Sequence, residues 1–180
     1  GMAAISIALL GVLKAGDHVI GADQLYGRSL RMMNEELPRL GIETSLVDAT
    51  DANAVASALK PNTKLILIET LSNPTLRMAD VSGILALRAR GVMVAVDNTF
   101  TTPAMFKPLE QGADITIQSV TKMLAGHSDA TLGYVAAKDP ALNTRFADLA
   151  ATIGVTASPF DCWLAERGLY SFDLRFERAS

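Results

Sequence analysis

The stretch Lys64-Leu65-Ile66-Leu67-Ile68-Glu69 places an unbroken apolar run between two charged residues. It lacks the alternation of polar and apolar side chains that marks a strand with one face in water. Val92-Met93-Val94-Ala95-Val96 is apolar throughout in the same way. Strands with such sequences belong to parallel sheets that are covered by helices on both faces. These two stretches therefore predict an α/β fold with buried, parallel strands.

Strand-like and helix-compatible segments alternate along the whole chain, which favours an α/β domain with a mostly parallel sheet flanked by helices. Strands are expected at residues 18–21, 43–47, 64–69, 92–96, 114–118 and 132–136. Helices are expected at residues 2–14, 28–40, 52–59, 81–90 and 140–152. Gly16, Gly41 and Gly91 each follow a helical pattern and precede a strand, so a left-handed backbone is expected at these glycines.

The composition excludes several classes of protein. At 180 residues and 49% hydrophobic, the chain can bury one core, and its length predicts one domain. The net charge is −3 without a run of Lys or Arg, so no nucleic-acid partner is expected. The apolar runs are far shorter than the roughly 20 residues that cross a bilayer, so no membrane span is expected. Cys162 is the single cysteine, which predicts a reducing, cytoplasmic location.

Both ends of the chain lie inside regular patterns. The first residues read directly as an apolar helix, without the basic segment or cleavage site of a signal peptide. The last residues belong to an amphipathic pattern that no glycine or proline ends. We therefore expect a fragment, with residues 1–180 forming the central part of a larger domain.

Lys122 is the strongest candidate for a reactive residue. Ligands of open α/β sheets bind beyond the carboxyl ends of the strands, where the sequence places Ser119-Val120-Thr121-Lys122. A lysine at the end of a buried strand can form a Schiff base, while the hydroxyls of Ser119 and Thr121 hold a phosphate. The alternative is an ordinary surface lysine at a strand end, and Lys122 alone does not exclude it.

Asp97 follows the apolar strand expected at residues 92–96. A carboxylate there must be hydrogen-bonded or paired if it is buried, and a protonated pyridine nitrogen would be such a partner. The alternative is an aspartate that caps the next helix or turns into the loop before Asn98 and Thr99.

Two weaker signals lie near other strand and helix ends. Gly1 and Met2 open an apolar helix, and the free N–H groups of a helix N-terminus can bind a phosphate. Tyr26 follows a strand and precedes Gly27, so its ring could stack on a flat cofactor. It could equally be a half-buried loop residue.

Five ordered motifs resemble the trans-sulfuration (Cys/Met metabolism) family of enzymes that use pyridoxal 5′-phosphate (PLP). They are Glu69-Thr70-Leu71-Ser72-Asn73-Pro74, Val96-Asp97-Asn98-Thr99-Phe100, Gly112-Ala113-Asp114, Ser119-Val120-Thr121-Lys122 and Gly126-His127-Ser128-Asp129. The family includes cystathionine γ-synthase, the cystathionine β- and γ-lyases and methionine γ-lyase. The resemblance implies an aspartate aminotransferase-like, fold type I large domain, with the N-terminal segment and the C-terminal domain missing from this chain.

The resemblance also implies PLP as cofactor and a role for each matching residue. Lys122 would form the Schiff base and move protons, Asp97 would pair with the pyridine nitrogen, and Tyr26 would stack on the ring and assist proton transfer. Asn73 would contact the ring hydroxyl. The phosphate would be held by Gly1, Met2, Ser119 and Thr121, and Glu69 and Thr99 would shape the pocket less directly.

The implied reaction is β- or γ-elimination or γ-replacement on a sulfur-containing amino acid, as in cystathionine γ-lyase, β-lyase or γ-synthase. The implied substrates are cystathionine, homocysteine, cysteine or an acylated homoserine, and the implied assembly is a homotetramer of close dimers. Arg28 stands where methionine γ-lyases place a cysteine, which argues against a strict methionine γ-lyase.

Other hypotheses remain open. Family members take a phosphate-binding tyrosine and arginine from an N-terminal segment of a neighbouring subunit, and a carboxylate-binding arginine from the C-terminal domain. Since none of these is present, the chain could be a catalytically incomplete fragment or a scaffold. A dinucleotide-binding domain is disfavoured because no G-x-G-x-x-G follows the first strand. No metal site is expected, and the apolar residues 153–174 are expected to pack at a domain or subunit surface.

Overall fold

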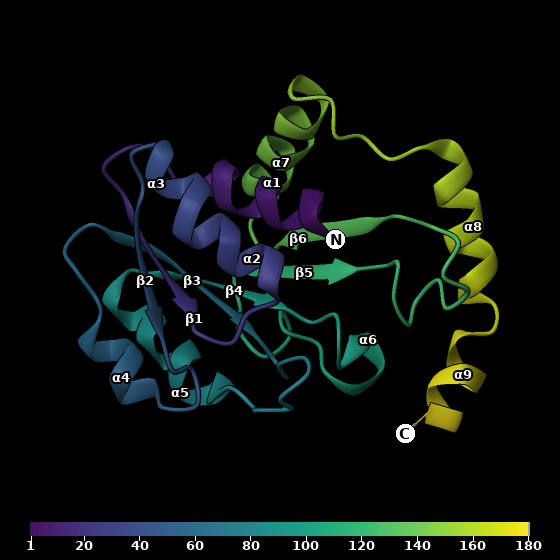
Figure 1. The fold of residues 1–180 in the computed structure, drawn as a ribbon, viewed down its shortest axis with the longest axis horizontal. Coiled ribbons are helices and arrows are strands. Elements are labelled where there is room, and N and C mark those ends of the chain that lie inside the picture. The colour runs from purple at the N-terminus through teal and green to yellow at the C-terminus, as the bar shows by residue number, and fades with distance from the viewer. Residues whose placement is uncertain (180) are drawn as a thin grey trace.

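A computed structural model describes residues 1–179 and contains one six-stranded sheet with the order β2-β1-β3-β4-β5-β6 (Figure 1). The strands are β1 (His18–Ala22), β2 (Glu43–Val47), β3 (Thr63–Glu69), β4 (Met93–Asp97), β5 (Ile115–Ser119) and β6 (Gly133–Ala137). Neighbouring strands from β2 to β5 pair in parallel, and β6 runs antiparallel to β5. The mostly parallel sheet expected from the sequence is confirmed, with strand boundaries shifted by one residue in most cases.

Helices cover both faces of the sheet. They are α1 (Met2–Val12), α2 (Gly27–Arg31), η1 (Met32–Glu36), α3 (Leu37–Arg39), α4 (Ala52–Ser57), α5 (Val81–Ala86), η2 (Leu87–Arg90), α6 (Thr102–Met105), α7 (Pro140–Thr152), α8 (Pro159–Leu169) and α9 (Phe172–Ala179). Figure 1 shows α1, α2, α3 and α7 on one face and α4 and α5 on the other. Within residues 1–179, no helix has the length and apolar character needed to cross a membrane.

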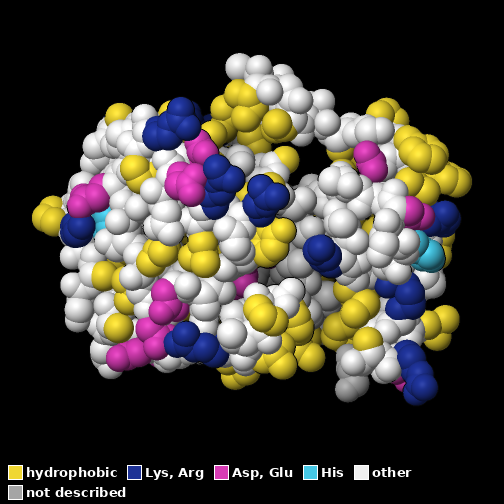
Figure 2. Space-filling model, in the orientation of Figure 1, with side chains coloured by type: hydrophobic (Ala, Val, Ile, Leu, Met, Phe, Trp, Pro, Cys, Tyr) yellow, Lys and Arg dark blue, Asp and Glu magenta, His cyan; other side chains and the backbone are white. Residues whose placement is uncertain are grey.

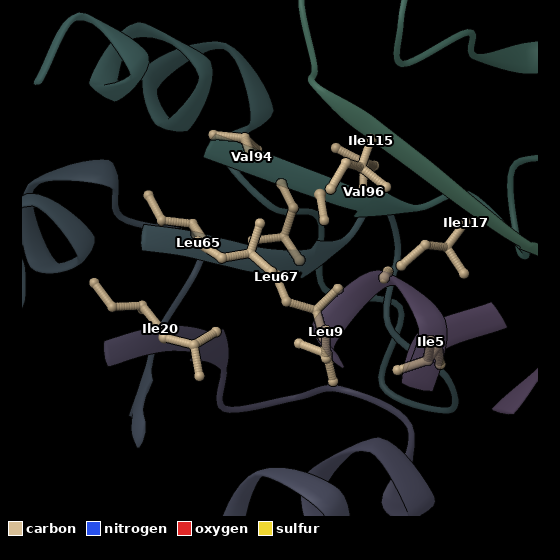
Figure 3. Close-up of a cluster of buried hydrophobic side chains, with 14 of the residues drawn as sticks. Ile5, Leu9, Ile20, Leu65, Leu67, Val94, Val96, Ile115 and Ile117 are labelled. Atoms are coloured by element: carbon tan, nitrogen blue, oxygen red, sulfur yellow. The ribbon is translucent and has the colours of Figure 1, made fainter. Parts of the chain in front are cut away.

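The main core lies on both faces of the sheet, with Val55 of α4 and Ile84 of α5 on one face and α1 on the other. This helix carries no charged side chain, and a helix that is apolar all round must be covered on several sides. It contacts β5, β6, α2 and α7. Figure 3 shows Ile5 and Leu9 of α1 gathered with sheet side chains, among them Leu67 and Ile117. The apolar β3 and β4 are buried along most of their length, as their sequences predict.

The helix expected at residues 28–40 is divided. Its middle part, η1, is a π-helix in which the Leu37 N–H donates to the Met32 carbonyl five residues earlier. Pro38 lacks an N–H, and in a regular α-helix its ring would clash with the carbonyl of Asn34, so a wider turn before it relieves the clash. Three other expected helices end early or tighten: α1 ends at Val12, α4 ends at Ser57 and α5 continues as the 3₁₀-helix η2. The short helix α6 was not predicted.

The left-handed backbone conformation expected at three glycines is confirmed. Their φ angles are +88° at Gly16, +74° at Gly41 and +79° at Gly91. Gly91 directly caps η2, and Gly41 follows the last residues of α3. Helix starts are fixed by side chains that accept a hydrogen bond from the first turn: Asp51 for α4, Asp80 for α5, Asp139 for α7 and Ser158 for α8.

The apolar residues 153–174 form α8 and the beginning of α9, which stand beside the sheet rather than on it (Figure 1). Leu164 and Ala165 are buried against the segment after β5, in a second cluster with Val120, Leu124 and Ala125. Other apolar side chains of this part are exposed, and Figure 2 shows hydrophobic side chains gathered over α8. They include Phe160, Trp163, Leu169, Tyr170 and Leu174. Packing of this part at a domain or subunit surface stays a prediction.

Candidate active site

Two carboxylates lie side by side where β3 and β4 end. Glu69 and Asp97 are direct partners in the register of these parallel strands. The next strand, β5, ends at Ser119, whose backbone N–H donates to the Thr99 hydroxyl at 2.7 Å. Polar groups from three neighbouring strands therefore meet at one edge of the sheet, the edge where α/β proteins bind ligands.

Asp97 is buried, with 8% of its surface exposed. Its Oδ1 accepts hydrogen bonds from the Thr99 N–H at 3.0 Å and the Thr99 hydroxyl at 2.5 Å. Within residues 1–179, no hydrogen bond reaches its other oxygen, Oδ2. Burial raises the pKa of Asp97, and the hydrogen bonds from Thr99 oppose the rise. Asp97 thus bonds to the loop that follows β4, as the alternative interpretation of this residue proposed, and its Oδ2 is available to a further hydrogen-bond donor.

Glu69 is partly buried beside Asp97. Its Oε1 accepts a hydrogen bond from the Tyr26 N–H at 2.7 Å, which joins β3 to the start of α2. Burial raises the pKa of Glu69 to about 7, although the Tyr26 N–H lowers it, and the charge of Asp97 adds to the rise. The Tyr26 side chain itself is 51% exposed. Glu69 therefore fixes the backbone that carries Tyr26, a role that the motif alone did not reveal.

The residues expected to hold a phosphate surround the N-terminus of α1. Gly1 is its N-cap, so the first N–H groups of the helix have no partner within the helix. A Cβ on Gly1 would lie 2.8 Å from the Ser119 Oγ, so a larger residue at this position would require the Ser119 side chain to move. The Ser119 hydroxyl has no hydrogen bond within residues 1–179. Gly1 and Ser119 therefore lie side by side at the start of α1, and the role of Gly1, Met2 and Ser119 in holding a phosphate stays a prediction.

Thr121 is placed differently. Its hydroxyl donates to the Leu132 carbonyl at 3.1 Å and accepts from the Leu132 N–H at 3.0 Å. In this conformation it braces the segment after β5 against the strand β6, and its proton is already used. Its role in holding a phosphate stays a prediction.

Lys122 is exposed on a turn that follows β5. The Lys122 N–H lies 3.4 Å from the Ser119 carbonyl, and the Gly126 N–H donates to the Lys122 carbonyl at 2.8 Å. Asp97 ends β4 and Lys122 follows β5, and these neighbouring strands are parallel, so both residues lie at the same edge of the sheet.

Asn73 is exposed in the segment after β3 and precedes a cis peptide bond to Pro74. No hydrogen bond of its side chain joins it to the other site residues within residues 1–179. Gly133 was missed: a Cβ there would lie 2.7 Å from the Gly1 nitrogen. A glycine inside an expected strand is the available signal, because it often marks a close backbone approach.

Two hollows flank this region. One is lined by Tyr26, Gly27, Arg28 and Arg31, at the edge of the carboxylate pair. The other lies between α1, β6 and α7, is lined by residues such as Ile7 and Phe146, and holds no titratable side chain. Among residues 1–179, no three His, Cys, Asp or Glu side chains gather as a metal ion would require.

Comparison with known proteins identifies relatives of the whole chain. Residues 1–180 match the model of the family described as Cys/Met metabolism PLP-dependent enzyme. Cystathionine beta-lyase MetC of Bacillus subtilis is 46% identical over 100% of this chain and 46% of its own length. L-methionine gamma-lyase of Porphyromonas gingivalis is 38% identical over 99% of this chain and 45% of its own length.

Solved structures agree with the sequence comparison. The structure of cystathionine gamma-lyase from Lactobacillus plantarum complexed with L-serine superposes with a TM-score of 0.92 and 36% identity, over 97% of this chain and 46% of that chain. The chain spans about half the length of the relatives that it matches. It belongs to the family of Cys/Met metabolism PLP-dependent enzymes.

Proposed function

We propose that this chain is the cofactor-binding part of a PLP-dependent enzyme that acts on sulfur-containing amino acids. The observation that carries the proposal is the buried Asp97 carboxylate, one oxygen of which accepts no hydrogen bond within residues 1–179, at the sheet edge where the exposed Lys122 follows the neighbouring strand. A buried carboxylate without a full set of partners costs free energy, and a cationic N–H at Oδ2 would remove that cost. The ring nitrogen of PLP is such a group.

The other side chains at this edge fit the rest of the cofactor. The N–H groups at the start of α1 and the Ser119 hydroxyl can donate to a phosphate. Gly1 and Gly133 allow the start of α1 to approach β5 and β6 closely there, because a Cβ on either glycine would meet the neighbouring segment. The Tyr26 backbone is bonded to Glu69 and the residue is half exposed, so its ring would be available to cover one face of a flat cofactor ring. Asn73 would donate to the ring hydroxyl, and Thr99 would hold Asp97 in place.

When bound, PLP supplies an aldehyde that condenses with amino groups and a ring that accepts the electron pair left at the substrate α-carbon. Asp97 would keep its negative charge toward the ring nitrogen. The Lys122 amine would take the proton from the α-carbon and return it at a later step, as a general base and then a general acid. Tyr26 would assist that transfer from the other side of the site.

We further propose β- or γ-elimination or γ-replacement as the reaction, with cystathionine, homocysteine, cysteine or an acylated homoserine as substrate. Support comes from relatives named cystathionine beta-lyase, cystathionine gamma-lyase and cystathionine gamma-synthase. Release of ammonia from cystathionine alone would indicate a lyase, whereas a requirement for both cysteine and an acylated homoserine would indicate a synthase.

A homotetramer of close dimers is proposed as the assembly. The exposed apolar side chains of α8 and α9, among them Trp163 and Leu174, support it, because such surfaces are commonly covered by a partner. A monomeric mass of the active, full-length enzyme in light scattering would contradict this. The exposed, free Cys162 agrees with a cytoplasmic location.

The cofactor proposal is tested by visible absorption of the full-length protein after PLP is added and the excess is removed. We expect a band that the Lys122→Ala variant lacks and that the Lys138→Ala variant keeps, since Lys138 is an exposed lysine beyond the end of β6. A folded wild-type protein without the band would refute the enzyme function and leave a scaffold derived from this family.

A further inference from the structure

Arg175 of α9 reaches the segment that carries Lys122. Its Nη1 donates to the Met123 carbonyl at 2.5 Å, and its Nη2 donates to the Leu124 carbonyl at 3.0 Å. Nη2 also donates to the Gly168 carbonyl at 2.8 Å, and Nε donates to the Ser171 hydroxyl at 3.1 Å. One guanidinium thus joins the two residues that follow Lys122 to the end of α8 and the start of α9.

Within residues 1–179 this arginine forms no ion pair: it donates to three backbone carbonyls, the Ser171 hydroxyl and the Met123 sulfur. A guanidinium presents five N–H donors in a rigid, planar fork, whereas a lysine ammonium is a single point. Only the fork can reach two consecutive carbonyls and a third one on another segment. The contact therefore depends on the identity of this side chain and not on its charge alone.

The segment that Arg175 contacts forms a turn, which two backbone hydrogen bonds of its own close. The Ala125 N–H donates to the Val120 carbonyl at 2.9 Å, and the Gly126 N–H donates to the Lys122 carbonyl at 2.8 Å. Leu124 and Ala125 pack against Leu164 and Ala165 of α8, in a cluster separate from the main core. Outside the turn, the contacts with α8 and α9 therefore fix the direction in which Lys122 leaves the backbone.

Two glycines show how closely these parts meet. Gly126 has a φ of +72°, and the guanidinium of Arg175 occupies the space where its Cβ would stand. Gly168 faces the Ala125 carbonyl in the same way. A side chain at either position would push α8 and α9 away from the turn. Both sides of the contact are thus shaped for close approach.

We propose that Arg175 is a positioning residue for Lys122. It holds the carbonyls of Met123 and Leu124, and the turn then presents Lys122 at the carboxyl end of β5, next to the strand that ends at Asp97. This inference rests on the proposed function, because it assigns Arg175 to the same site. A proton-transferring group that is misplaced by about 1 Å can lose about 100-fold in rate, so the clamp matters for turnover even though it touches no reactant.

The test compares Arg175→Met, which keeps the side-chain length and removes the donors, with Arg178→Met on the same helix. Arg178 is exposed and has no hydrogen bond or ion pair within residues 1–179. Hydrogen exchange of the cofactor-free, full-length protein is measured first. We expect faster exchange of the Ala125 and Gly126 amides in Arg175→Met, unchanged exchange in β3 and β4, and wild-type exchange in Arg178→Met.

The second measurement uses the PLP-loaded protein. We expect PLP to dissociate about 10-fold faster from Arg175→Met and kcat to fall by about 10- to 100-fold, with KM changed by less than about twofold. The effect falls on kcat and not on KM because Lys122 would move protons only after the substrate has bound. Arg175→Lys should change in the same direction by a smaller factor, and it serves as the second variant if Arg175→Met does not fold.

Wild-type exchange at Ala125 and Gly126, together with wild-type PLP release and kcat in Arg175→Met, would overturn the inference. Loss of protection across β3 and β4 in both Arg175 variants would also overturn it, since it would indicate a general structural role. Failure of the proposed function looks different: the wild-type protein would then take up no PLP, while the exchange experiment would still report whether Arg175 fixes the turn.

Discussion

Glu69 should make the stability of the cofactor-free protein depend on pH. Burial raises its pKa from 4.5 to about 7, so folding favours the protonated carboxyl. The stability that this provides is fully present below pH 4.5 and is lost as the pH rises through about 7. The difference of about 2.5 pH units corresponds to about 3 kcal/mol, an upper value because the side chain is partly exposed to water.

The perturbation is Glu69→Gln, which keeps an acceptor for the Tyr26 N–H and removes the charge. Its free energy of unfolding should equal that of the wild type near pH 4.5 and exceed it by up to about 3 kcal/mol near pH 9. Urea unfolding of both proteins across this range measures the difference.

The matched control is Asp48→Asn. Hydrogen bonds from the Thr50 N–H and hydroxyl lower the pKa of Asp48, so Asp48 stays ionised over this range. The difference between this variant and the wild type should therefore not vary between about pH 5 and about pH 9. A difference for Glu69→Gln that is equally flat would refute the argument that burial holds this carboxyl near neutrality.

Three further outcomes are expected. His18 is fully buried between the hydroxyls of Thr63 and Ser45, and burial lowers its pKa. The stability that the neutral imidazole provides is present above pH 6.5 and is lost as the pH falls. The urea concentration at the unfolding midpoint should therefore decrease when the pH is lowered below 6.5, and it should decrease less in His18→Gln. Asp97→Asn should raise the urea midpoint of the cofactor-free protein at pH above 3.8, because ionising the buried carboxylate costs free energy, and should weaken PLP binding at least about 10-fold in a spectroscopic titration. Leu67→Ala, at a position 1% exposed in the core of Figure 3, should lower the free energy of unfolding by about 2–5 kcal/mol in urea, and a loss below about 1 kcal/mol would contradict the packing described.

The sequence alone determined the class of fold and the family. Uninterrupted apolar runs at β3 and β4 can be satisfied only by burial on both faces, which is why they predicted parallel strands before any contact was known. Glycines after helical patterns predicted left-handed turns, because that conformation strains residues with a Cβ. Asp97 and Lys122 could be singled out because a polar residue directly after a buried strand is not required by packing.

The tertiary structure decided which of these residues meet. The hydrogen bond from Tyr26 to Glu69 joins residues 43 positions apart, and that from Arg175 to Met123 joins residues 52 positions apart. The close approach of Gly1 to Gly133 is likewise set by how α1 packs on β5 and β6. Periodicity in a sequence reports how each element is buried, but not the distance between elements. The pKa of Glu69 and the clamp on the Lys122 turn depend on those distances, so only the folded chain could reveal them.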